Sequence, residues 1–127
     1  MTFLKKILLV DHESALTELV RSALESTGKF LVKVERDEAV AWNAARWFLP
    51  DLILLDGIAA PVSHRYLTNG ASVENTPTLY LHGADLAEQK VATRGFIAGY
   101  SFLTGPMPIA DLTGWVEELT NSHAAAA

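Results

Sequence analysis

Two apolar runs that each end in a carboxylate constrain the fold of this chain most strongly. Ile7–Val10 is followed by Asp11, and Leu52–Leu55 is followed by Asp56. Short, continuous apolar runs are typical of strands that are buried on both faces of a parallel sheet. Because the carboxyl ends of neighbouring parallel strands open into one crevice, we expect the two carboxylates to face each other there. Such a pair suits a hard divalent cation or an unusually reactive acid.

Composition limits the classes of protein to which the chain can belong. Its 127 residues, half of them apolar, suffice for one domain, which we expect over residues 1–120, with a disordered tail over 121–127. The net charge of -5, with ten scattered Lys and Arg residues, argues against nucleic acid and anionic membranes as partners. No apolar run is long enough to cross a membrane. The chain has no cysteine, and we expect a cytoplasmic location.

The order of the apolar patterns predicts alternating strands and helices. Strands are expected at 7–10, 30–35, 51–56, 77–81 and 100–103. Helices are expected from Ser14 to Gly28, from an Asp37 cap to Pro50, at 64–68, at 85–94 and at 109–119. Five strands that alternate with helices predict an α/β fold of the flavodoxin-like, doubly wound type. Its five-stranded sheet would be wholly parallel, with strand order 2-1-3-4-5 and helices on both faces.

Four sequence blocks resemble the receiver domains of response regulators in order and spacing. They are Leu8–Glu13, Pro50–Asp56, Thr76–Leu81 and Phe102–Pro106. The resemblance extends over nearly the whole chain. It implies that Asp56 is a phosphoacceptor, since receivers accept a phosphoryl group on the aspartate that ends the third strand. A carboxylate can attack phosphorus in line if the charge on the phosphoryl oxygens is neutralised.

The resemblance also implies a magnesium site, in which this sequence departs from the family pattern. Asp11, Asp56 and the backbone carbonyl of Ile58 match the family's ligands. The second acid of the usual pair is replaced by His12, and neutral imidazole is a poor ligand for magnesium. Glu13 is a doubtful substitute, because on a strand or a tight turn its side chain points in a different direction from the side chain of His12. We therefore expect weak magnesium binding.

The switch positions of the family are altered as well. His82 stands where receivers carry Ser or Thr, and Gly105 stands where they carry a lysine that pairs with the phosphoryl group. Loss of that lysine removes a charge-assisted contact of about 1.5 to 3 kcal/mol. Phe102 matches the aromatic residue that reports switching. The resemblance thus implies a receiver with impaired switching.

Three functions remain open from the sequence. The first is a receiver-like domain in phosphorelay signalling, which is not an enzyme although Asp56 would promote its own phosphorylation. The second is a pseudo-receiver that binds proteins without phosphorylation. The third, more remote, is a small flavodoxin-like enzyme or cofactor binder, against which the absence of a Gly-rich phosphate loop counts. The expected partners are a sensor histidine kinase or other signalling protein and, through the last two helices and the fifth strand, a second copy of the chain.

The proposed metal defect leads to a first prediction. His12→Asp should strengthen magnesium binding, because a further hard oxygen ligand increases the negative charge that faces the ion. Titration of the wild type and the variant with magnesium measures the effect. Equal affinities would mean that Glu13 or water already supplies the missing ligand.

Overall fold

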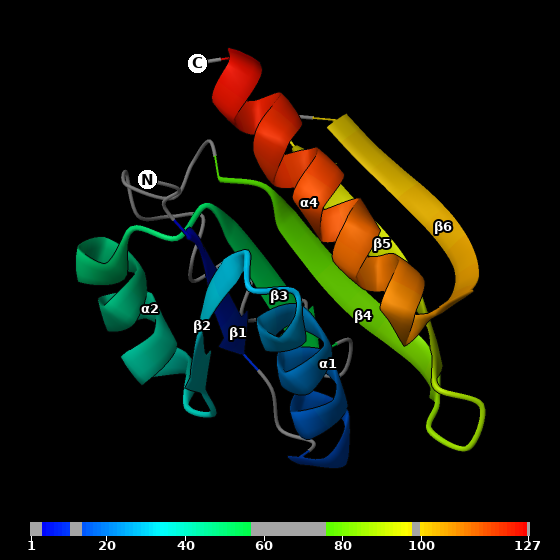
Figure 1. Ribbon diagram of the computed structural model, residues 1–127. Helices are drawn as coiled ribbons and strands as arrows, with labels where there is room; N and C mark the ends of the chain where they lie inside the picture. The colour runs from blue at the N-terminus through cyan, green and yellow to red at the C-terminus, as the bar shows by residue number, and fades with distance from the viewer. Residues whose placement is uncertain (1–3, 11–13, 57–75, 98–99, 127) are drawn as a thin grey trace.

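A six-stranded mixed sheet with helices on both faces forms the core of the computed structural model (Figure 1). The structure describes residues 4–10, 14–56, 76–97 and 100–126. The strands are β1 (Lys5–Val10), β2 (Phe30–Glu35), β3 (Leu52–Asp56), β4 (Thr78–Asp85), β5 (Lys90–Ile97) and β6 (Tyr100–Pro108). The helices are α1 (Ser14–Ser26), α2 (Glu38–Phe48) and α4 (Ile109–Ala126).

The sheet has the order β2-β1-β3-β4-β5-β6. The first four of these strands are parallel, and they follow the order predicted from the sequence. The last two pairs, β4 with β5 and β5 with β6, are antiparallel. The predicted α/β class is therefore confirmed, and the sheet is mostly parallel. The prediction of five strands that are all parallel is wrong.

The segment 85–94 accounts for this difference. The sequence predicts a helix there, but the chain makes a tight turn and returns as β5. The Asp85 carboxylate accepts a hydrogen bond from the Glu88 backbone N–H at 3.1 Å, and Gln89 has a φ of 54°. In β5, Val91, Ala92 and Thr93 are all buried, between the exposed residues Lys90 and Arg94. The buried run and its β-branched side chains, Val91 and Thr93, favour a strand over the sparse helical stripe.

The two faces of the sheet form two apolar cores. On one face, α1 and α4 pack against the sheet, and each contributes residues spaced about one helical turn apart, such as Leu16, Val20 and Leu24 of α1. On the other face, α2 contributes the small residues Ala41, Ala44 and Ala45. α4 continues beyond Leu119 into the segment for which the sequence predicts a disordered tail.

Local signals in the sequence explain where α1 and α2 begin and end. Asp37 caps α2 as predicted, and its Oδ1 accepts a hydrogen bond from the Val40 N–H at 3.1 Å. Gly28 follows α1 with a φ of +73°, which glycine adopts without a steric penalty. These two positions confirm the predicted boundaries.

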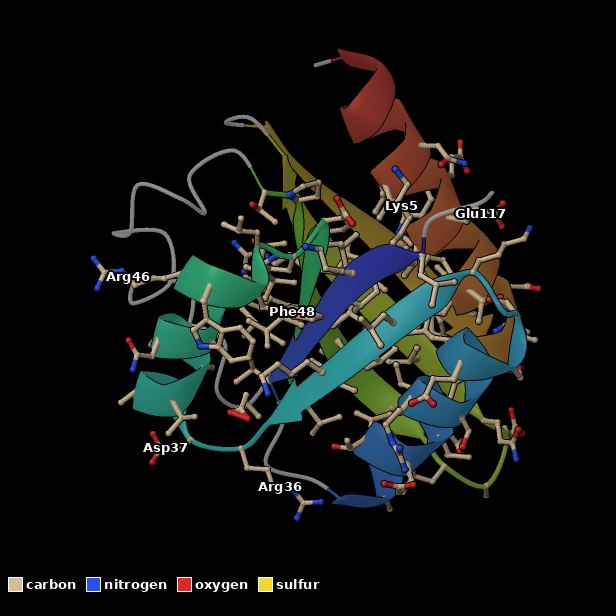
Figure 2. The ribbon with its side chains drawn as sticks, turned by 60° about the vertical axis from the view of Figure 1, so that its left-hand side comes forward. Lys5, Arg36, Asp37, Arg46, Phe48 and Glu117 are labelled. Carbon is tan, nitrogen blue, oxygen red and sulfur yellow. The ribbon has the colours of Figure 1, made fainter. Side chains whose placement is uncertain are left out.

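Polar contacts join segments that are distant in the chain. The Lys6 N–H donates to Asp51 Oδ2 and the Asp51 N–H donates to the Lys6 carbonyl, both at 2.7 Å. This pair of bonds sets the start of β3 beside β1. Glu117 of α4 lies near the start of β2, where its carboxylate binds Lys29 at 2.9 Å (Figure 2).

Two further sequence predictions concern the outer parts of the molecule. The short helix predicted at 64–68 lies outside the described residues. In the part of the chain that the structure describes, no helix is both long enough and apolar enough to cross a membrane.

The central position of β3 leads to a prediction about stability. Leu54 is fully buried, whereas Leu31, on the edge strand β2, is 49% exposed. Leu54→Ala should lower the free energy of unfolding by about 2 to 5 kcal/mol, since it removes buried methyl groups and leaves a cavity. Leu31→Ala, the matched control, should change it by less than about 0.5 kcal/mol. Urea unfolding followed by circular dichroism measures both, and similar effects would contradict the described packing.

Candidate functional site

The candidate site lies at the carboxyl ends of the parallel strands, where Asp56 ends β3. Val10, the last residue of β1, pairs with Leu55, and Asp56 itself pairs with Leu81 of β4. β3 thus ends between two parallel neighbours, at the position where α/β sheets bind ligands. The structure therefore brings the backbone of Asp56 to the edge that the sequence predicted.

The predicted magnesium ligands fall mostly outside the described residues. Asp11, His12, Glu13 and Ile58 are not described, and Asp56 is described through its backbone. Within the described ranges, no group of three or more His, Asp or Glu side chains could hold a metal ion. The magnesium site stays a prediction from the sequence.

His82 lies beside the end of β3. It follows Leu81, the partner of Asp56, and it pairs with Ala92 of β5. Its side chain is exposed to solvent. β4 continues beyond the end of β3 as far as Asp85, because its later residues pair with β5. Of the three predicted switch positions, His82 is the one on a strand next to β3.

Gly105 and Phe102 lie elsewhere. Both belong to β6, and Phe102 pairs with Gly95 of β5. The resemblance to receivers places these residues on a strand next to β4, but β5 occupies that position. Three strand spacings separate β6 from β3, a distance of roughly 14 Å. Gly105 thus lies on a strand that is not a neighbour of β3, and its role as a switch position stays a prediction from the sequence.

A pair of threonines, which the sequence did not single out, fixes β6 against β5. The hydroxyl oxygens of Thr93 and Thr104 lie 2.7 Å apart, and Thr104 Oγ1 also accepts the Thr93 N–H at 3.1 Å. Thr93 is fully buried, so these bonds satisfy polar groups that water cannot reach. In the sequence, the β-branched residues Val91 and Thr93 lie on either side of Ala92, and this alternation is the signal that could have indicated a strand here. The pair is structural, and it stabilises the strand that separates Gly105 from β4.

Comparisons with known proteins give similarity at the level of the fold. No protein-family model and no curated protein matches this chain. Among solved structures, it is similar to a variant of HypX from Aquifex aeolicus, with a TM-score of 0.57 and 14% identity over 98% of this chain and 28% of HypX. It is also similar to methionyl-tRNA formyltransferase from Clostridium thermocellum, with a TM-score of 0.53 and 12% identity over 84% of this chain and 54% of that protein.

The chain therefore spans about a quarter of HypX and about half of the formyltransferase. At these identities the likeness concerns the arrangement of strands and helices. It supports a mixed α/β fold, and it does not transfer an activity or a substrate to this chain.

The separation of Gly105 from β3 can be tested with introduced cysteines, because the natural chain has none. Thr93→Cys with Thr104→Cys should form an intramolecular disulfide, since these two residues pair across β5 and β6. Asp56→Cys with Gly105→Cys should not, because roughly 14 Å of sheet lies between their strands. Refolding with oxidised glutathione, followed by alkylation and intact mass measurement, distinguishes the outcomes. A disulfide in the second variant only would support the all-parallel arrangement.

Proposed function

We propose that this chain is a receiver-like domain in phosphorelay signal transduction, with Asp56 as the phosphoacceptor. The observation that carries the proposal is the position of Asp56 at the end of β3, between the parallel neighbours β1 and β4. The order β2-β1-β3-β4 is the one that the resemblance to receivers implies for these strands. The four sequence blocks support the same function.

The proposed chemistry is transfer of one phosphoryl group. A carboxylate oxygen of Asp56 attacks phosphorus in line, and the bond from phosphorus to the leaving oxygen breaks. Magnesium would neutralise part of the charge on the phosphoryl oxygens, held by Asp11, Asp56 and the Ile58 carbonyl. Because His12 replaces an oxygen ligand, we propose weak metal binding and slow transfer. The domain is a signalling module that would receive its phosphoryl group from a sensor histidine kinase in the cytoplasm.

A second candidate function is favoured by the position of β6. With Gly105 three strands from β3, no lysine at that position could contact a phosphoryl group on Asp56. A phosphorylated state would then make few contacts that the unphosphorylated state lacks, and it would shift the conformation little. This favours a pseudo-receiver, which binds a signalling protein in one constant state. The remote alternative of an enzyme or cofactor binder has only a likeness of fold in its support.

Phosphorylation by acetyl phosphate tests the proposal. Incubation of the full chain with acetyl phosphate and magnesium should give an intact mass increased by one phosphoryl group. Asp56→Asn should abolish the adduct, because an amide is a poor nucleophile at phosphorus. Asp85→Asn is the matched control, since Asp85 is an exposed carboxylate at the end of β4, and it should leave the adduct unchanged.

The same experiment separates the two candidate functions. No adduct at any time or magnesium concentration would exclude the phosphoacceptor and leave the pseudo-receiver. An adduct that survives in Asp56→Asn would place the modified residue elsewhere and contradict both the assignment and the resemblance on which it rests.

A further inference from the structure

β6 forms one edge of the sheet in the described part of the chain. It runs along the outer side of the molecule beyond β5 (Figure 1). An edge strand presents backbone N–H and C=O groups that can pair with another strand. Proteins usually protect such edges with charged side chains, prolines or bulges.

The opposite edge, β2, is protected in this way. It carries Lys33 and Glu35, whose charged groups lie 3.8 Å apart. The Lys33 ammonium also lies 4.9 Å from the centre of the Trp47 ring of α2. A strand added to β2 would have to disturb these contacts.

The edge at β6 has no comparable protection along its first half. None of the nine residues in Tyr100–Pro108 is charged. Pro106, Pro108 and a register shift opposite Val91–Thr93 protect the second half. Tyr100–Thr104 contains neither proline nor charge, and its aromatic and branched residues favour strand pairing. This half includes Leu103, which is 74% exposed and the most exposed large apolar side chain among the described residues.

We propose that a second copy of this chain pairs with β6. The two β6 strands would run antiparallel about a two-fold axis at Leu103, so that Leu103 pairs with the partner's Leu103 and Phe102 pairs with the partner's Thr104. Two such sheets would join into one continuous sheet. The inference is independent of phosphoryl transfer to Asp56.

The distribution of charge favours a second copy as the occupant. The chain has a net charge of -5, so two copies repel each other over most of their surfaces. The edge at β6 is uncharged, and a second copy presents the same uncharged edge. Antiparallel pairing about a two-fold axis is self-complementary, because each strand supplies the donors and acceptors that the other lacks. A strongly charged partner strand would find no opposite charge on β6 with which to form an ion pair.

Sedimentation velocity tests the proposal on the full chain. The wild type should dimerise with a Kd between about 10 µM and 1 mM, because pairing of so short a segment buries less area than a standard interface. Leu103→Lys should weaken the dimer at least tenfold, since two lysines would face each other across the axis. Leu31→Lys is the matched control on the other edge strand, where an exposed leucine is also replaced, and it should leave the Kd unchanged.

Cross-linking gives a second readout, because a covalent link traps a dimer that is only partly populated. In this cysteine-free chain, Leu103→Cys should be converted to a covalent dimer by a short bis-maleimide, and Leu31→Cys should not. Circular dichroism confirms that each variant is folded. A wild type that stays monomeric to 1 mM, or a Leu31→Lys variant that weakens the dimer as much as Leu103→Lys, would overturn the proposal. A phosphoryl adduct on Asp56 would have no bearing on it.

Discussion

The burial of β3 on both faces is the constraint on which the rest of this structure depends. Leu52 and Leu54 point into the core beneath α1 and α4, while Ile53 and Leu55 point into the core beneath α2. Each of these side chains is at most 1% exposed. Full burial of one such side chain stabilises the fold by about 1.5 to 3 kcal/mol. Because successive residues of a strand point to opposite faces, this one run holds both layers of helices against the sheet.

The same constraint positions the proposed phosphoacceptor. A strand that is packed on both faces and paired with β1 and β4 cannot shift its register by one residue without moving its apolar side chains to the wrong core. The residue that ends it, Asp56, is therefore held at a fixed height on the edge of the sheet. A reactive carboxylate needs such a rigid support if it is to attack in line.

The antiparallel half of the sheet has a different origin and different consequences. A tight turn between Asp85 and Lys90 reverses the chain, so that β5 occupies the place beside β4. The bonds between Thr93 and Thr104 then set β6 against β5. As a result, Gly105 is removed from the neighbourhood of β3, and β6 becomes the last strand of the sheet among the described residues. One local turn thus affects both the proposed switch and the proposed dimer.

The sequence by itself determined the parallel half of the protein. Its continuous apolar runs predicted β1 and β3, and Asp37 and Gly28 marked helix boundaries, because burial on both faces and backbone capping leave local patterns. Only the tertiary structure decided the half from Asp85 to Pro108. There, the weak stripe of Leu86 and Val91 fits a helix, while Val91 and Thr93 fit a strand. The outcome depends on burial of Val91 against residues of α4 and on the pairing of Thr93 with Leu81 and Thr104, and these partners lie outside the segment 85–94. Local periodicity does not encode such contacts, because their free energy arises only when the segments meet.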